Sequence, residues 1–145
     1  MPNSIFTLVY TSKSRKKIDQ ELLTQLLKVA RTNNARDDIT GFLTVRGEYF
    51  AQLLEGPEDK VRACYERIAA DRRHTQIVLQ GESHSETRIM ASWNMALVET
   101  PHADHSGEQL IDLFELGRAG GRYADSTSLH DMLRVFSREA QILEI

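Results

Sequence analysis

The segment "FAQLL", just before "EGP", places the strongest constraint on the fold of this chain. Side chains in a β-strand alternate between the two faces of a sheet, so Phe50, Gln52 and Leu54 share one face. Ala51 and Leu53 lie on the other face. Both faces are mainly apolar, and such a sheet needs a cover on each side. Gln52 is the exception, because a buried amide costs free energy unless it finds hydrogen-bond partners.

The residues that precede this strand show first strand spacing and then helix spacing. The segment 5–10, "IFTLVY", predicts a strand that ends at Tyr10, before a Thr-Ser-Lys-Ser turn. Leucines at helical spacing then predict a helix, and Asp19 is suited to be its N-cap. Asn33 and Asn34 are poor helix residues, so we expect the helix to end there.

The region around "FAQLL" predicts a β-hairpin with an Arg-Gly turn. Pro57 suits the first turn of a second helix, which we expect to end near Asp71. Two further strands are predicted at 76–85 and 91–99. The order β-α-β-β-α-β-β predicts an α+β fold with a ferredoxin-like sheet and two helices on one face.

The C-terminal segment supplies a candidate cover for the other face of the sheet. Apolar residues at helical spacing predict helices at 106–117 and 127–141. A segment of this size is too short to be a second domain. We therefore expect one domain over 1–100 and a two-helix segment over 101–145 that caps the sheet or pairs between subunits.

The composition is that of a soluble globular protein, with 41% apolar and 27% charged residues and a net charge of −3. This charge gives no electrostatic footprint for nucleic acid. A lone cysteine, Cys64, excludes an internal disulfide, and two histidines within 102–105 lack a third metal ligand. The N-terminal apolar run precedes its basic cluster, which is the reverse of the order in a signal peptide, so we expect none. No apolar run approaches the roughly 18 residues of a membrane span. We expect a cytoplasmic protein with no metal, nucleic-acid or membrane partner.

Polar and aromatic side chains recur where the predicted sheet should meet its helices. Each one alone has an ordinary structural explanation; Arg67 and Asp71, for example, have the spacing of an i,i+4 surface ion pair. Trp93 and Met95 are expected to share one face of the last strand. Gln52 is harder to explain, because a buried amide in mid-strand needs partners. The set comprises Tyr10, Asn33, Asn34, Gln52, Arg67, Asp71, Arg73, His74, Trp93 and Met95.

Together these residues form motifs that resemble a known family. The segments "TLVYTS", "NNARDDITGFLTVRGEYFAQLLEGPEDKV", "YERIAADRRH" and "SWNMAL" resemble the BLUF domain, a blue-light sensor that uses flavin adenine dinucleotide (FAD). The resemblance covers about residues 4 to 100, and the C-terminal helices look like those of the short, stand-alone members. It implies non-covalent FAD, with the isoalloxazine ring between the two helices and against the sheet.

The resemblance also implies a role for individual residues in holding the flavin. Leu26 and Ile68 match the aliphatic side chains that sandwich the ring. Asn34 matches the asparagine that bonds C4=O and N3, and Asn33 matches its neighbour along the pocket. Ala30 stands where some members carry a hydroxyl residue. The polar side chains expected at the pyrimidine side and the mouth are Arg67, Asp71, Arg73 and His74.

Gln52 matches the glutamine that lies between the flavin and a reactive tyrosine, here Tyr10. The resemblance implies that light drives an electron and then a proton from Tyr10 to the flavin, with Gln52 as the relay. The amide is left rotated or tautomerised, with a new hydrogen bond to C4=O and a small red shift. Met95 and Trp93 match residues that exchange access to Gln52, next to the C-terminal helices.

These features describe a photoreceptor rather than an enzyme, because no net redox change remains. No cyclase or DNA-binding sequence follows residue 100, so we expect output through a separate partner protein, from at least a dimer. One alternative is a small ferredoxin-like hydrolase, for which "TSKSRKK" is a poor phosphate cradle. Another is a flavin-free interaction module, which would not need Tyr10, Gln52 and Asn34. A yellow protein with a reversible red shift would exclude both.

Overall fold

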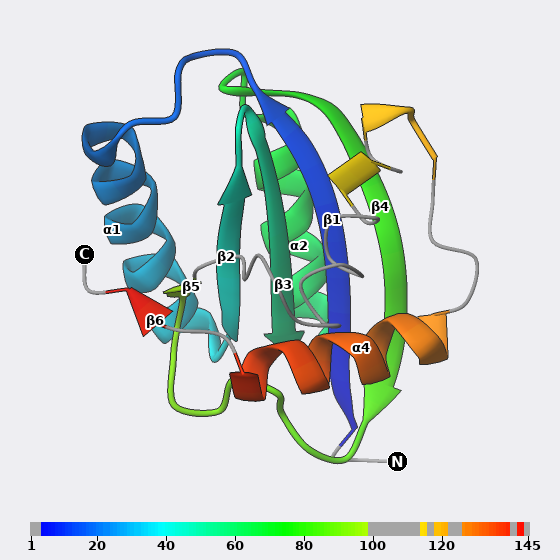
Figure 1. Ribbon diagram of the computed structural model, residues 1–145. Coiled ribbons are helices and arrows are strands. Elements are labelled where there is room, and N and C mark those ends of the chain that lie inside the picture. The colour runs from blue at the N-terminus through cyan, green and yellow to red at the C-terminus, as the bar shows by residue number, and fades with distance from the viewer. Residues whose placement is uncertain (1–3, 99–113, 116–117, 122–125, 140–141, 144–145) are drawn as a thin grey trace.

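The computed structural model describes residues 4–98, 114–115, 118–121, 126–139 and 142–143 (Figure 1). Six strands form one sheet: β1 (Ile5–Ser14), β2 (Thr40–Arg46), β3 (Tyr49–Gly56), β4 (His74–Ser85), β5 (Ala96–Val98) and β6 (Ile142–Leu143). The helices with described bounds are α1 (Gln20–Asp37), α2 (Glu58–Ala70) and α4 (Ser126–Glu139). None of these helices is long and apolar enough to cross a bilayer.

The strand order in the sheet is β4-β1-β3-β2-β5-β6. The first four strands form the antiparallel ferredoxin-like arrangement, and β5 adds to the edge in parallel with β2. The predicted α+β topology, with a hairpin between β2 and β3, is therefore confirmed. Two-residue β6 pairs antiparallel with β5 and was not expected from the sequence.

The first strand is longer than the sequence predicted. β1 continues beyond Tyr10 to Ser14, because its neighbours on both sides supply pairing partners. Ser12 pairs with Phe50 of β3, and Ser14 pairs with His74 of β4. The expectation that Tyr10 ends the strand is therefore wrong. Tyr10 lies in the middle of β1, where the chain is held from both sides.

The first helix begins as predicted and ends later. Asp19 is the N-cap, and its side chain accepts the amide of Leu22 at 2.9 Å. The expected stop at Asn33 and Asn34 is wrong, since the helix continues to a left-handed C-cap at Asp38. Asn34 is buried, and its side chain donates to the carbonyl of a distant segment. This tertiary bond outweighs the weak helix propensity of asparagine.

One face of β3 packs against α1 and α2. Phe50 and Leu54 lie in a buried cluster with Leu27 of α1 and Val61 of α2. Gln52 shares this face, as the alternation of strand side chains predicted. The helical side of the sheet therefore combines an apolar cluster with one buried amide.

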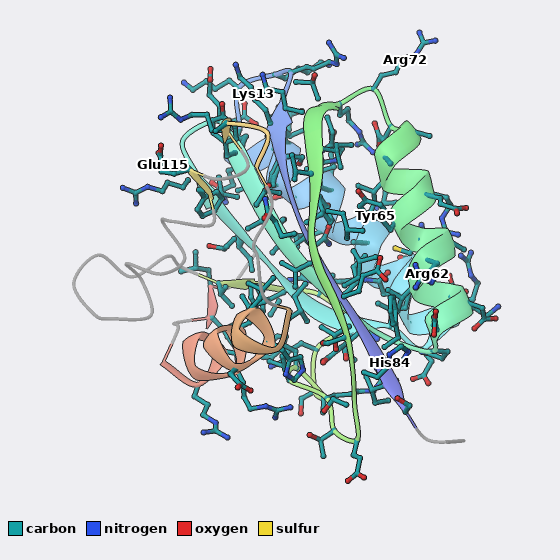
Figure 2. All side chains as sticks on the ribbon, turned by 90° about the vertical axis from the view of Figure 1, so that its right-hand side faces the viewer. Lys13, Arg62, Tyr65, Arg72, His84 and Glu115 are labelled. Atoms are coloured by element: carbon teal, nitrogen blue, oxygen red, sulfur yellow. The ribbon has the colours of Figure 1, made fainter. Side chains whose placement is uncertain are left out.

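The other face of β3 packs against α4. Leu53 lies in a second buried cluster with Leu129 and Leu133. Figure 2 shows α2 and α4 on opposite sides of the sheet. α4 lies within the helix expected at 127–141 except for its first residue, whereas the helix expected at 106–117 falls outside the described residues apart from 114–115. The two-helix cap and the division at residue 100 therefore stay predictions.

The strand expected at 91–99 is much shorter than predicted, because β5 begins only at Ala96. The carbonyl of Trp93 accepts the backbone amide of Gly41 at 3.0 Å. The carbonyl of Met95 accepts Nε of Arg31 at 2.9 Å. Before Ala96, a side-chain hydrogen bond and a single backbone hydrogen bond thus take the place of regular strand pairing. Trp93 and Met95 do not share a strand face: Trp93 is 42% exposed and Met95 is buried.

Glu55, near the end of β3, is fully buried on the side of the sheet away from α1 and α2. Its carboxylate accepts Oγ1 of Thr40 at 2.8 Å. It also accepts the backbone amides of Ile89 and Met90, both at 2.6 Å. Charge-assisted bonds of this kind are among the stronger ones in proteins. Glu55 therefore fixes the segment that leads toward β5.

Replacing Glu55 by Ala is expected to lower the free energy of unfolding by about 3 kcal/mol, because two backbone N–H groups lose their acceptor. Urea unfolding followed by circular dichroism measures this change. Glu48→Ala is a matched control, since that side chain is 70% exposed and reaches Lys13 only at 3.7 Å. It should change stability by less than about 0.5 kcal/mol. Equal losses in the two variants would contradict the role given to Glu55.

Candidate functional site

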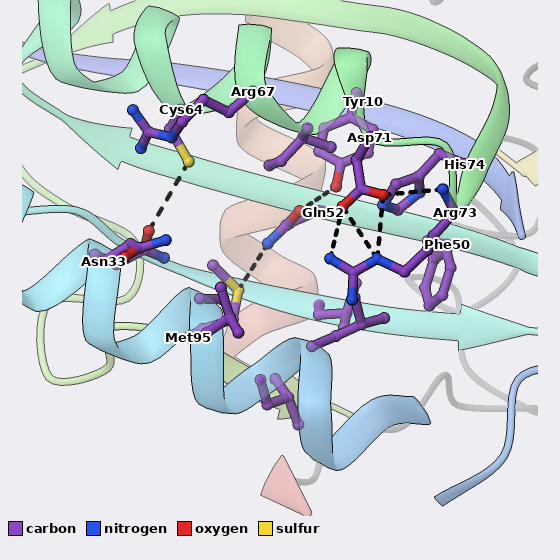
Figure 3. Close-up of a pocket in the computed structure, with 17 residues that line it drawn as sticks. Tyr10, Asn33, Phe50, Gln52, Cys64, Arg67, Asp71, Arg73, His74 and Met95 are labelled. Carbon is purple, nitrogen blue, oxygen red and sulfur yellow. Dashed lines mark hydrogen bonds and ion pairs between the residues drawn. The ribbon is translucent and has the colours of Figure 1, made fainter. Parts of the chain in front are cut away.

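A pocket lies between α1 and α2, over the face of the sheet that carries Gln52 (Figure 3). The space between its lining residues is about 800 Å³, counting open solvent at its mouth. Of the residues expected at the site, the pocket brings together Tyr10, Leu26, Asn33, Asn34, Gln52, Arg67, Ile68, Asp71, Arg73, His74 and Met95. Trp93 is not among the lining residues.

Gln52 has a bonding partner on each side. Tyr10 lies directly opposite it in the pairing of β1 with β3, and the phenol donates to Oε1. Nε2 of Gln52 donates to Sδ of Met95 at 3.2 Å. A thioether accepts but does not donate, so the phenol and the sulfur together define which way the amide points. The primary amide still has one N–H and further acceptor capacity for a ligand.

Tyr10 is fully buried, and burial raises the pKa of its phenol well above the ordinary range. The nearby ionisable groups of Cys64, Tyr65 and Asp71 raise this pKa further. The phenol therefore stays protonated at physiological pH. Its proton lies in the bond to Gln52, where it is ready for transfer but is not released to solvent.

Asn34 links the pocket to the segment before β5. Its Nδ2 donates to the carbonyl of Asn94 at 2.8 Å. Its Oδ1 lies 3.9 Å from Sγ of Cys64, whose pKa is raised by burial. The side-chain amide carries two N–H groups, so a second donor remains available to a ligand.

The polar residues near the end of α2 are paired differently from the simple sequence expectation. Arg67 contacts Asp37 at 3.4 Å and does not form the i,i+4 pair with Asp71. Asp71 instead binds Arg73, with a shortest N···O distance of 2.6 Å. The hydrogen bonds from Arg73 hold the pKa of Asp71 below its ordinary value. The pair contributes oriented polar groups to the pocket with its charges largely compensated.

His74 lines the pocket at the start of β4. Its Nδ1 lies 2.9 Å from Oγ of Ser12, and its ring centroid is 5.4 Å from that of Phe50. Burial lowers the pKa of His74; Asp71 partly offsets this effect, and Arg73 adds to it. The imidazole is therefore neutral near pH 7 and presents one donor and one acceptor.

Aliphatic side chains from the two helices form the remaining walls. Leu26 comes from α1 and Ile68 comes from α2, so a flat ring between the helices would contact one on each side. The bonding groups of Asn34 and Gln52 then lie where a ring with a polar edge needs them. The described residues thus fit a flavin, whose ring is flat and has nitrogen and oxygen atoms along one edge.

Sequence reasoning did not assign several lining residues to the site. Val29 gave a usable signal, because it follows Leu26 by three residues and so lies on the same side of the helix. Cys64 lies one helical turn before Ile68 and could have been placed by that spacing. The other lining residues not assigned a cofactor contact were Leu27, Ala30, Leu43 and Phe50. Asn94 and Arg31 gave no signal, because their bonds join distant segments.

The ferredoxin-like sheet and its pocket with a buried Tyr-Gln pair define a cofactor-binding domain. Residues 5–96 match the BLUF family, described as "Sensors of blue-light using FAD". The match covers more than half of the chain, and the chain therefore belongs to the BLUF family. It is a blue-light-sensing flavin photoreceptor by this membership, as the sequence resemblance indicated.

Two curated relatives illustrate the contexts in which this domain occurs. The chain is 39% identical over 72 residues to the blue light- and temperature-regulated antirepressor BluF of Escherichia coli K12, covering 50% of this chain and 18% of that protein. It is 32% identical over 93 residues to photoactivated adenylate cyclase subunit beta of Euglena gracilis, covering 63% and 11%. The chain thus spans less than a fifth of either relative.

Two solved structures are similar over nearly their whole length. The photo-activated state of BlsA superposes with a TM-score of 0.75 at 21% identity, covering 97% of this chain and 99% of that one. The dark-state structure of BlrB, a BLUF protein, gives 0.67 at 25% identity, covering 93% and 98%. The BlsA comparison supports the fold alone. Both chains are of similar length to this one.

The pKa of His74 should lie below the ordinary value of about 6.5. The folded protein then binds this proton less readily than the unfolded chain. His74 should therefore reduce stability as the pH falls through about 6.5 toward the lower folded value. A proton NMR titration of the imidazole Cε1–H in the dark protein measures the midpoint directly.

Two variants separate the electrostatic contributions to this pKa. Asp71→Asn removes a neighbouring negative charge and should lower the pKa of His74 further. Arg73→Gln removes a positive charge and should raise it. A midpoint above about 6.5 in the unsubstituted protein would show that the neighbours and not burial control the pKa of His74. Shifts of the opposite sign in the two variants would contradict the charge effects given to Asp71 and Arg73.

Proposed function

We propose that Gln52 is the switch of this blue-light photoreceptor, with Tyr10 as its electron and proton donor and Met95 as the reporter of its orientation. The observation that carries this proposal is the bonded series in the pocket. The Tyr10 hydroxyl donates to Gln52, and Gln52 donates to Met95. The three side chains are buried, so their bonds do not compete with bulk water.

The residues that would hold the flavin come from both helices and the sheet. Leu26 and Ile68 would contact the faces of the ring. Asn34 has a spare N–H for a carbonyl on the ring, beside the contribution of Gln52. Polar lining groups suited to the pyrimidine side and the mouth are Asn33, Arg67, Asp71, Arg73 and His74. Bound flavin supplies blue-light absorption and, when excited, a strong one-electron oxidant.

Tyr10 is the donor that the pocket presents for this chemistry. The phenol gives up one electron and passes its proton along the hydrogen bond to Oε1 of Gln52. Both return to Tyr10 when the charge recombines, so no net oxidation remains. The amide of Gln52 is left rotated or tautomerised. The change is one of hydrogen bonding, and the protein returns to its starting composition after each photocycle.

Met95 makes the two arrangements of Gln52 unequal. Its sulfur accepts the amide N–H at 3.2 Å. A rotated amide would turn its oxygen toward the sulfur, and two acceptors do not bond. A rotated Gln52 therefore loses its contact with Met95. Because Met95 immediately precedes β5, the change reaches the edge of the sheet without crossing the core.

We infer that output passes to a separate protein through residues 101–145, and that the chain acts as a homo-oligomeric sensor and not as an enzyme. The E. coli relative is named as an antirepressor, a function exerted on another protein. The Euglena relatives are named as cyclases, and the chain covers only 9–11% of them. α4 packs on the face of the sheet opposite the pocket, where a change in its packing would be accessible to a partner. The family match leaves the flavin-free module and the hydrolase without support.

Replacing Gln52 by Leu should abolish the light-induced red shift while flavin remains bound, because the apolar walls stay intact and only the switchable amide is lost. Light-minus-dark absorption spectra measure the shift, and the flavin-to-protein ratio measures binding. Gln25→Leu removes an exposed amide from α1 and is the matched control. A normal difference spectrum from Gln52→Leu would refute the assignment of the switch.

Analytical ultracentrifugation in darkness and under blue light tests the proposed output. We expect a mass of at least a dimer, and a light-dependent change in sedimentation for the full chain. Gln52→Leu should show the dark behaviour under both conditions, because its amide cannot switch. A monomer with identical sedimentation in the two conditions would exclude the oligomeric sensor.

A further inference from the structure

Residues 93–95 form an irregular segment whose carbonyls are bonded by groups outside the segment. Gly41 donates its backbone amide to the carbonyl of Trp93. Asn34 donates its side-chain amide to the carbonyl of Asn94. A carbonyl outside a regular ladder has no strand partner, so groups from other parts of the chain supply its hydrogen bond. Each of these carbonyls therefore has its own donor, and the donors come from different parts of the chain.

The third carbonyl, that of Met95, accepts Nε of Arg31 at 2.9 Å. Arg31 lies on α1, is half-buried, and is not among the residues that line the pocket. A guanidinium donor makes a stronger bond than a neutral one. Arg31 thus holds the backbone of the residue whose side chain contacts Gln52, from outside the flavin pocket.

Met95 is consequently held at two points. Its carbonyl is fixed by Arg31, and its sulfur accepts Nε2 of Gln52 at 3.2 Å. Ala96, the next residue, pairs with Phe42 of β2 and begins the regular strand. On the other side of the Met95 α-carbon, Asn34 bonds the carbonyl of Asn94. Because the chain is bonded on both sides of that α-carbon, the Met95 side chain has little freedom to leave Gln52.

We propose that Arg31 is a positioning residue of the photoswitch. It keeps the thioether of Met95 facing Gln52 and thereby sets the rate at which the lit arrangement returns to the dark one. This proposal rests on the switch assigned to Gln52 above. The Met95 sulfur bonds only the dark orientation of the amide, so a firmly held sulfur favours the return.

The kinetic test compares Arg31→Met with the unsubstituted protein after a blue flash. Methionine keeps the length of the side chain but removes the donor. Recovery of the dark spectrum should slow by about 3- to 10-fold, the size expected for partial loss of one charge-assisted bond in the return step. The red shift and the flavin content should be unchanged, because Tyr10 and Gln52 are untouched.

Two further variants control for charge and folding. Lys28→Met removes an exposed cation from the same helix, one turn earlier, and should recover at the unsubstituted rate. Arg31→Lys keeps a cationic donor and should restore most of the rate lost in Arg31→Met. Equal slowing in Lys28→Met and Arg31→Met would overturn the proposal, as would recovery of Arg31→Met within about twofold of the unsubstituted protein.

A double-mutant cycle tests whether Arg31 acts through the sulfur of Met95. Met95→Leu removes the acceptor while keeping an apolar side chain. In that background Arg31→Met should have no further effect on recovery, because the route it uses is already lost. Multiplicative effects of the two substitutions would show that Arg31 acts by another route and would overturn the proposal.

A light-independent measurement separates this proposal from the function on which it rests. Methyl-labelled methionine gives an NMR signal for Met95, identified by its loss in Met95→Leu. Arg31→Met should shift or broaden that signal in darkness, and Lys28→Met should not. Absence of any red shift in the unsubstituted protein would overturn the photoreceptor function, whereas an unmoved Met95 signal in Arg31→Met would overturn the positioning role alone.

Discussion

The buried amide of Gln52 is the constraint on which the rest of this structure depends. An amide in the middle of a central strand must be bonded, and here the phenol of Tyr10 and the thioether of Met95 provide the bonds. These partners come from opposite sides of the strand. Tyr10 belongs to β1, and Met95 immediately precedes β5, which pairs with β2. Satisfying one polar group therefore ties together the strands that form the pocket floor.

Both faces of β3 are buried, and each face packs against a different part of the molecule. The face with Gln52 is covered by α1 and α2, and the pocket lies between them. The face with Leu53 is covered by α4 through Leu129 and Leu133. The sheet is thus both the wall of the sensory site and the surface on which a C-terminal helix rests. In the proposed switch, the signal passes around the edge of the sheet, through Met95, and not through its close-packed centre.

Much of this arrangement follows from local sequence patterns. Alternation placed Gln52 with Phe50, whereas the family resemblance assigned Leu26 and Ile68 to the two sides of the flavin ring. The family resemblance, not spacing, selected the polar lining residues. Patterns failed where a distant group decides local structure. Neither the helical turn beyond Asn34 nor the irregular backbone before β5 is visible without knowing that α1 bonds that segment.

The brevity of β5 has a consequence for the dynamics of the whole domain. The strand has three residues and only two pairs with its parallel neighbour, Phe42 with Ala96 and Leu43 with Leu97. So small a unit opens at a fraction of the cost of global unfolding, and its amide protons should exchange with solvent earlier than those of the long central strands. The photoreceptor thus attaches its light-sensing centre to a sparsely paired margin of its own sheet. A rearrangement whose free energy is too small to disturb the core can be comparable to the free energy that holds β5 in the sheet.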